Sequence, residues 1–180
     1  MKHYLTTLLA VCLTTTAFCQ SSVDSMTIKN IDGANVSLMP YHGKKMLFMI
    51  MPSRLADSSR LDEIAAFNTQ YGDSIKLVGI LSKEDGYIDS NKASIKAMYQ
   101  SKGLNILLTE GMYIKKAAGA GQSALMQWLT RRNLNKRFDE DATGMGQQFY
   151  VNEAGKLYAV LVAQTPLFSP AVKRSIERKL

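Results

Sequence analysis

Two neighbouring carboxylates, Glu84 and Asp85, follow a strand-like run and form the most chemically suggestive pair in this chain. Paired carboxylates can exchange protons with a substrate. Arg54 closes another apolar run, "LFMIMPSR", and we expect its guanidinium to face them. A solvated turn explains the same residues, and it is the favoured interpretation. Acid–base catalysis by Glu84 stays open as the alternative.

Other candidate nucleophiles and metal ligands are few. Ser53 and Ser58 flank the turn after Met51, but a serine hydroxyl attacks a substrate only when a base lies beside it. The one imidazole beyond residue 19 belongs to His42, in a loop expected to lie too far away. Met49 and Met51 share a strand face, which suits a soft metal, although core packing is favoured. We therefore expect no metal site and no cofactor.

The first residues read as a secretory signal segment, residues 1–19. Lys2 supplies the positive start, and the apolar run Tyr4–Leu13 is too short to span a bilayer. Small residues, Ala17 and Cys19, occupy the −3 and −1 positions of a cleavage site after Cys19. We expect an exported protein in the periplasm or cell envelope of a bacterium, with one domain over residues 20–180.

Two alternatives remain for this segment. It would otherwise be the first helix or strand of the domain, or Cys19 would carry a lipid anchor, against which the bulky Phe18 argues. Both cysteines, Cys12 and Cys19, lie within it. After cleavage, residues 20–180 contain no thiol, which excludes disulfides, thiolate catalysis and cysteine–zinc sites within the domain.

The chain has a net charge of +7, from 22 basic and 15 acidic residues. Such an excess favours an anionic partner. The densest basic stretches, "RRNLNKR" (131–137) and "KRSIERK" (173–179), carry apolar residues at helical spacing, which is typical of solvated helix faces. No row of stacking aromatic residues accompanies them, so nucleic-acid binding is not expected. No second apolar run approaches transmembrane length.

Hydrophobic periodicity predicts alternating strands and helices. The predicted elements are a hairpin within 25–39 turning at Asp32-Gly33, strands at 44–51, 75–82 and 104–110, helices capped near Asp57–Ser59, Ser90–Asn91 and Ser123, a hairpin at 147–162, and a last helix starting at Ser169-Pro170 with Val172, Ile176 and Leu180 on one face. This order predicts an α/β, thioredoxin-like fold: a central mixed β-sheet flanked by helices, with an N-terminal β-hairpin extension.

Four stretches carry a family resemblance: "IKNIDGANVSLMPYHGKKMLFMIMPS", "IKLVGILSKEDG", "LNILLTEGMYI" before "SALMQWL", and "FYVNEAGKLYAVLVAQTPLFSPAVKRSIERKL". In this order and spacing, from about Val23 to Leu180, the chain resembles glutathione peroxidase-like proteins of the thioredoxin superfamily. Secreted thioredoxin-like thiol oxidoreductases fit almost as well. Each motif alone is a weak indication, and the match depends on the order and spacing of all four along the chain.

The resemblance implies a peroxidase with cysteine or selenocysteine at the turn from strand to helix. It also implies a glutamine after the next strand and a tryptophan–asparagine pair before the final hairpin, which activate that nucleophile. These positions fall on Leu55, Glu84, Gly144 and Met145. None of them holds the residue that the family uses.

We therefore expect a glutathione peroxidase-like framework without its redox centre. It would bind an unknown protein or small molecule in the former active-site cleft, with Leu55 as the packed-over remnant. The expected lining of this cleft is Ser53, Arg54, Leu55, Glu84, Gln147 and Gln148. The alternative is a thiol-dependent peroxidase or oxidoreductase of the oxidative stress response.

Overall fold

The computed structural model describes residues 22–178. The predicted signal segment with its two cysteines, and Leu180 on the last helix, lie outside the described residues. Over residues 22–178, none of the helices has both the length and the apolar character needed to cross a bilayer.

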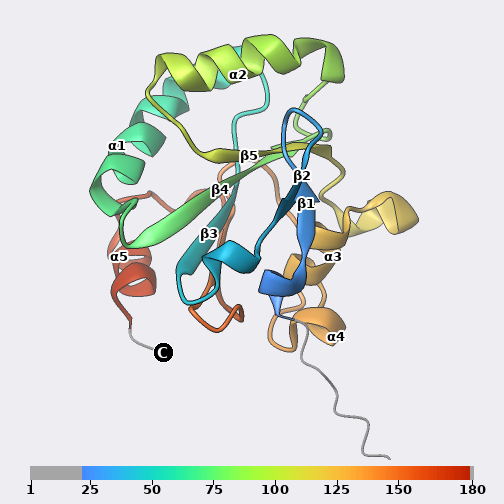
Figure 1. Cartoon of the computed structure of the whole chain (residues 1–180), viewed down its shortest axis with the longest axis vertical. Coiled ribbons are helices and arrows are strands. Elements are labelled where there is room, and N and C mark those ends of the chain that lie inside the picture. The colour runs from blue at the N-terminus through green and yellow to red at the C-terminus, as the bar shows by residue number, and fades with distance from the viewer. Residues whose placement is uncertain (1–21, 179–180) are drawn as a thin grey trace, which may run out of the picture.

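A five-stranded mixed sheet forms the centre of the fold (Figure 1). Its strands are β3 (Lys45–Ile50), β4 (Ile75–Ser82), β5 (Leu107–Met112), β6 (Gln148–Val151) and β7 (Leu157–Leu161), in the spatial order β5-β4-β3-β6-β7. β3 pairs in parallel with β4 and antiparallel with β6, and every residue of β3 is buried. Burial on both faces explains why this strand reads as a continuous apolar run.

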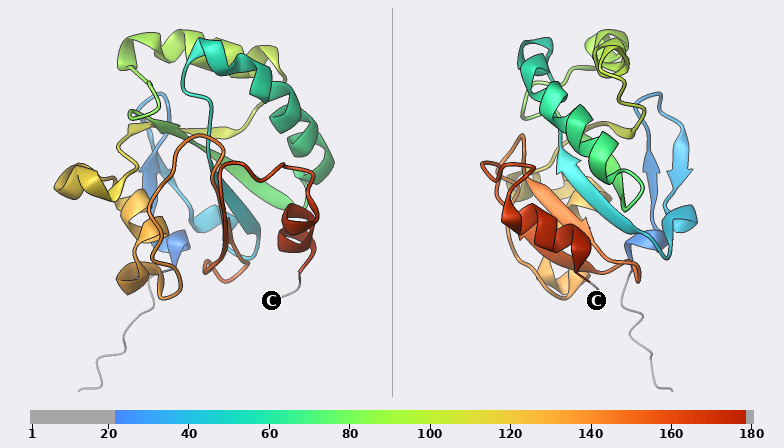
Figure 2. Two further views of the ribbon diagram at one scale, coloured as in Figure 1. Left: turned by 180° about the vertical axis from the view of Figure 1, so that it is seen from behind. Right: turned by 90° about the vertical axis from the view of Figure 1, so that its left-hand side faces the viewer.

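Helices cover both faces of the sheet (Figure 2). The helices are α1 (Leu61–Tyr71), α2 (Lys92–Ser101), α3 (Ala124–Thr130), α4 (Arg132–Asn135) and α5 (Pro170–Glu177). Short 3₁₀ helices connect them: η1 (Val23–Ser25), η2 (Met39–Tyr41), η3 (Leu55–Arg60), η4 (Asp89–Asn91) and η5 (Lys116–Gly121). Side chains of α1, α2 and α5 share one hydrophobic cluster, and those of α3 share the other.

Alternate residues of β3 enter these two clusters. Leu47 and Met49 pack with α1, α2 and α5, whereas Met46 and Phe48 pack with α3. This is the two-residue period expected of a strand between two layers. Met49 and Met51 are 3% and 0% exposed, which confirms that they are core residues.

An N-terminal hairpin flanks the β5 edge of the sheet. It consists of β1 (Thr27–Lys29) and β2 (Asn35–Ser37), paired antiparallel around the predicted turn. The Ile31 amide donates to the Leu108 carbonyl of β5 at 2.8 Å. The hairpin thus satisfies part of an otherwise exposed sheet edge.

Two predicted helix boundaries are wrong. η3 precedes α1, and no side chain caps α1, because the Asp57 carboxylate is bound by Arg54 instead. The predicted helix from Ser123 is broken at Arg131, whose backbone is extended between α3 and α4. The caps at Ser123 and Ser169 are confirmed, since both hydroxyls accept a backbone N–H.

Candidate functional site

Four strands of the sheet end at one edge, which we term the carboxyl edge. β3, β4 and β5 are parallel, and β7 shares their direction because β6 runs antiparallel to both of its neighbours. Loops that follow such strands are the usual location of binding sites in α/β sheets. The residues carried over from the family resemblance fall in or near these loops.

The turn after β3 is fixed by buried hydrogen bonds. The Ser53 hydroxyl donates to the Met51 carbonyl and accepts from the Ser82 amide, both at 3.0 Å. The Tyr99 hydroxyl donates to the Pro52 carbonyl at 2.8 Å, and burial raises its pKa, so that it remains a donor. Ser53 is 2% exposed, and its hydroxyl joins two strands rather than facing a ligand.

Leu55 is the first residue of η3, directly after this turn. Its side chain is 51% exposed, so the interpretation that it is packed over is wrong. Met51 and Leu61, which precede and follow Leu55 in the sequence, are by contrast fully buried in one core cluster. The position that the resemblance assigns to the nucleophile therefore faces solvent and carries an unreactive side chain.

A cleft of about 270 Å³ lies beside Leu55. Its lining comes from the turn after β3, the loop after β4 and the loop before β6: Arg54, Asp57, Glu84, Asp85, Gly86 and Met145. The structure thus brings Arg54 and Glu84 together with Met145, one of the carried-over positions. Leu55 does not belong to the lining, nor do Ser53, Gln147 and Gln148.

Gln147 and Gln148 are buried and hold the chain before β6. The Gln147 Oε1 accepts the Thr143 amide at 2.7 Å. The side-chain Nε2 of Gln148 donates to the Thr165 carbonyl at 3.0 Å, while its Oε1 accepts a hydrogen bond from the Tyr150 hydroxyl at 2.7 Å. Both amides are used to connect loops, as buried polar groups require.

Arg54 lines the cleft and forms an ion pair with Asp57. Its Nε and Nη2 lie 3.1 and 3.3 Å from the two carboxylate oxygens. The hydrogen bond to Asp57, its charge and the more distant charge of Asp85 raise the pKa of Arg54. The aliphatic part of Arg54 lies against Gly86, where a Cβ would come within 2.6 Å of Arg54 Cδ.

Glu84 joins the loop after β4 to the segment after β5. Its carboxylate accepts the Ile114 amide at 2.9 and 3.0 Å and the Lys115 amide at 3.0 Å. Backbone N–H groups that converge on a carboxylate form strong hydrogen bonds. Glu84 therefore has a structural partner, which argues against the hypothesis that it serves as a free acid or base.

Asp85 differs from its neighbour. Its Oδ2 is buried and has no hydrogen-bond partner among residues 22–178. Gly144, which the resemblance assigns to the activating pair, lies next to Asp85. A Cβ at Gly144 would lie 3.1 Å from Asp85 Oδ1. The cleft consequently contains three carboxylates against one guanidinium. The lining predicted from the sequence contains only Arg54 and Glu84 of these residues. It omits Asp57, Asp85, Gly86 and Met145, although the turn "EDG" could have indicated Asp85 and Gly86.

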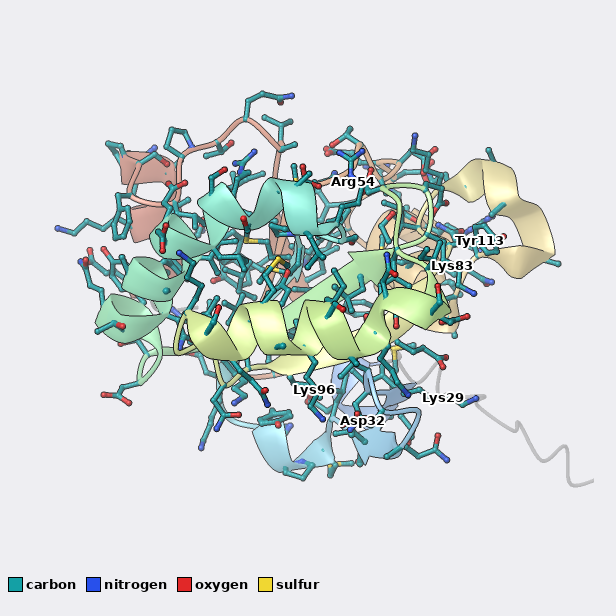
Figure 3. The ribbon with its side chains drawn as sticks, turned by 90° about the horizontal axis from the view of Figure 1, so that it is seen from above. Lys29, Asp32, Arg54, Lys83, Lys96 and Tyr113 are labelled. Atoms are coloured by element: carbon teal, nitrogen blue, oxygen red, sulfur yellow. The ribbon has the colours of Figure 1, made fainter. Side chains whose placement is uncertain are left out.

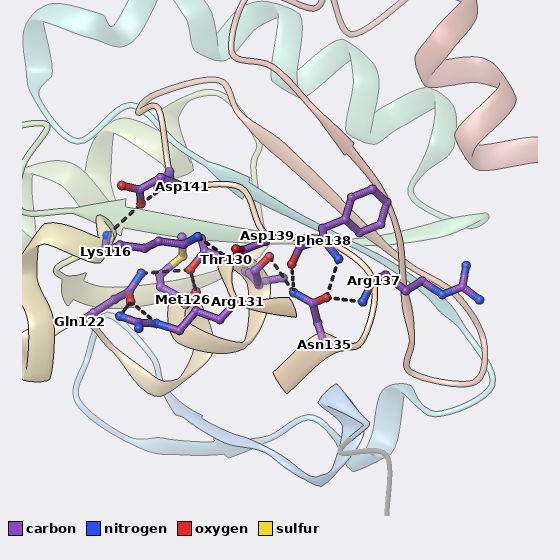
Figure 4. Close-up of polar contacts among 12 residues, drawn as sticks. Lys116, Gln122, Met126, Thr130, Arg131, Asn135, Arg137, Phe138, Asp139 and Asp141 are labelled. Carbon is purple, nitrogen blue, oxygen red and sulfur yellow. Dashed lines mark hydrogen bonds and ion pairs between the residues drawn. The ribbon is translucent and has the colours of Figure 1, made fainter. Parts of the chain in front are cut away.

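A polar network fixes the loop that leads to Gly144 and Met145 (Figure 4). The Asp141 carboxylate accepts the Lys116 amide at 2.8 Å, and the Lys116 ammonium pairs with Asp139 at 2.7 Å. Arg131 donates to the Gln122 side-chain oxygen at 3.3 and 3.0 Å. Part of the basic stretch 131–137 is therefore committed to internal contacts.

Further side chains at the carboxyl edge are exposed. Lys83 lies over the ring of Tyr113, with 5.6 Å from Nζ to the ring centroid, and both gather with Arg54 at one end of the molecule (Figure 3). Four large apolar side chains that follow the four co-directional strands are 48–54% exposed: Leu55, Ile88, Tyr113 and Val162. The edge thus carries a small acidic cleft and four exposed apolar side chains.

We expect Glu84→Ala to destabilise the protein by about 2 kcal/mol, because the buried Ile114 amide would lose its acceptor. Amide hydrogen exchange over residues 113–122 should accelerate, and the midpoint of urea unfolding should fall. The matched control is Asp85→Ala, which removes a carboxylate with an unpartnered buried oxygen and should leave stability unchanged or slightly raised. Equal losses in both variants would contradict the structural role of Glu84.

No protein-family model matches this chain, and no curated protein matches it either. Solved structures do. The apo structure of Trgpx aligns with a TM-score of 0.62 at 15% identity, covering 88% of this chain and 97% of the other. This is a thioredoxin-like fold.

Two further solved structures show the same thioredoxin-like fold. A thioredoxin-family thiol:disulfide interchange protein from Chlorobium tepidum aligns with a TM-score of 0.58 at 15% identity, over 87% of this chain and 97% of that one. T. cruzi GPX1 gives 0.57 at 10% identity, over 86% and 92%. The fold class predicted from the sequence is confirmed. At such identities the likeness concerns the framework, and function must be argued from the site.

Proposed function

We propose that this chain is an exported glutathione peroxidase-like protein that does not turn over peroxide. Instead it binds a protein partner at the carboxyl edge. The observation that carries this proposal is the exposed Leu55 at the start of η3, where a thiolate would be required. Residues 22–178 contain no cysteine, so no neighbouring thiol can replace it.

The size of the cleft favours a protein over a small molecule. At about 270 Å³ it lies below the roughly 300–1,000 Å³ of ordinary ligand pockets. The four half-exposed apolar side chains at the same edge of the sheet are of the kind that protein interfaces bury. We infer a contact in which apolar side chains of the partner cover Leu55 and its neighbours.

The charge of the cleft changes the expected chemistry of the partner. The overall positive charge favours an anionic ligand, but three carboxylates face one guanidinium here, and that guanidinium is already paired. A cationic side chain of the partner that enters the cleft would lie among the carboxylates of Asp57, Glu84 and Asp85. We therefore propose an apolar and locally basic partner surface at this edge.

The activity half of the proposal is tested by peroxide consumption with glutathione or thioredoxin as reductant. We expect the rate to equal that of the protein-free reaction, because no residue of the cleft can form a sulfenic acid. Turnover that co-purifies with the protein and scales with its concentration would instead establish the thiol-dependent peroxidase. The binding half is tested with two variants, one with a photo-crosslinking residue in place of Leu55 and a control with it in place of Met39, which is also exposed. We expect the partner to be crosslinked from position 55 and not from position 39.

A further inference from the structure

The outer edge of β7 is open in the part of the chain that the structure describes. β5, the other outer strand, is flanked by the N-terminal hairpin, through the Ile31–Leu108 hydrogen bond and a bridge between Asn30 and Thr109. β7 pairs with β6 on its inner side, and no strand of residues 22–178 lies beyond it. Its outward backbone groups can therefore accept another strand.

The β7 sequence lacks the usual protection of such an edge. "LYAVLV" (157–162) contains no charged residue and no proline, the devices by which exposed strands avoid unwanted pairing. A register shift between Tyr150 and Val151 disturbs the start of the strand, while Ala159, Val160 and Leu161 pair regularly with β6. The usable edge is accordingly residues 159–162.

A groove of about 650 Å³ accompanies this edge. Ala159 and Leu161 form its strand side, and Ala171, Arg174 and Arg178 form part of its helical side. α5 lies next to β6 and β7, as the right-hand view of Figure 2 shows. Since alternate side chains of a strand share one face, every second residue of an added strand would enter this groove.

The charge of the groove distinguishes among possible occupants. The groove also contains one carboxylate, that of Glu177, which lies 3.8 Å from the ammonium of Lys173, one turn earlier on α5. Arg174 and Arg178 follow each other at the same one-turn spacing, and no carboxylate of residues 22–178 lies within ion-pair distance of either. Two cations thus remain beside an apolar strand edge.

We propose that this groove binds an extended, acidic segment of a partner protein, which adds to β7 as a further strand. Backbone hydrogen bonds to β7 would supply affinity, and acidic side chains at alternate positions would pair with Arg174 and Arg178. A second copy of this chain fits less well. Its own β7 offers no acid, and two-fold pairing would bring both arginine pairs onto one face of the joined sheet.

The groove shares no lining residue with the cleft at the carboxyl edge, and only Val162, just after β7, belongs both to the strand edge and to the exposed apolar residues of the carboxyl edge. Strand addition at β7 goes beyond the proposed function, and its failure would leave that proposal untouched. Lys45, the first residue of β3, binds the end of α5. Its Nζ donates to the Ile176 carbonyl at 2.6 Å and also to the Arg178 carbonyl. The end of α5 is thereby held in place near β7.

The test uses the full chain and a short synthetic peptide in which valine alternates with glutamate. We expect saturable binding, with slowed amide hydrogen exchange at residues 159–162. Arg174→Glu combined with Arg178→Glu should weaken binding about tenfold. The matched control reverses two exposed arginines elsewhere, Arg60→Glu with Arg137→Glu, and should retain at least half of the affinity. A neutral pair, Arg174→Gln with Arg178→Gln, separates lost attraction from any defect in folding.

Several outcomes would overturn the proposal. A peptide with lysine in place of glutamate could bind equally well, or the protection could fall outside β7. Equal weakening by the control pair would show that only the total charge matters. Sedimentation of the peptide-free chain as a dimer, with residues 159–162 already protected, would assign the edge to a second copy instead.

Discussion

Gly146→Ala is expected to destabilise the protein by about 3 kcal/mol, which combines backbone strain with a steric clash. Gly146 has a φ of +98°, a conformation that residues with a side chain rarely adopt. An added Cβ would lie 2.6 Å from the backbone oxygen of Ala163, which cannot rotate away. The Gly146 amide also donates to the Ile50 carbonyl at 2.8 Å, so any shift disturbs the end of β3.

Urea unfolding followed by the fluorescence of Trp128, the one tryptophan and a buried residue, measures this effect. Gly103→Ala is the matched control. It also has a positive φ, of +70°, but nothing lies within 4 Å of its added Cβ, so only about 1 kcal/mol of strain is expected. If both variants lose the same stability, the clash with Ala163 is not significant.

The sheet was predictable because its signal is local. The apolar run from Met46 to Ile50 belongs to a strand buried on both faces, and such a run can be recognised without knowing its neighbours. The hairpin at Asp32-Gly33 and the caps at Ser123 and Ser169 are likewise determined within a few residues.

The helix start after β3 was not predictable in the same way. Asp57 has the composition of a helix cap, yet its carboxylate is bound by Arg54 three residues earlier. The Arg54 side chain also lies along Gly86, which comes from a different loop. A capping residue and an ion-pair partner look identical in sequence, and only the tertiary arrangement decides between them.

Some features of the site could be derived from the sequence and others could not. The absence of a thiol from residues 22–178 could be derived, because it depends only on which residues are present. The burial of Ser53, Gln147 and Gln148 could not, because each side chain satisfies a backbone group brought close by the fold. The exposure of Leu55 could not be derived either, because an apolar residue between the buried Met51 and Leu61 gives no sign in the sequence of which way it faces.

Leu55→Cys is expected to create an accessible thiol but no peroxidase. Peroxide turnover should stay within about twofold of the wild-type background, since an unactivated thiol at neutral pH is only a few per cent thiolate. The three carboxylates of the neighbouring cleft oppose a further negative charge, and Arg54 is already neutralised by Asp57. The surroundings therefore favour the protonated thiol over the nucleophile.

The pH dependence of alkylation of Leu55→Cys measures this effect directly, alongside the peroxide assay. Adding Asp85→Asn should speed alkylation near neutral pH, because it removes one of the opposing charges. Ala56→Cys, one residue further along η3, controls for the mere presence of an exposed thiol. Rapid, saturable peroxide turnover by Leu55→Cys alone would show that this edge still holds residues able to activate a nucleophile, and the protein would then be a peroxidase that lacks only its sulfur.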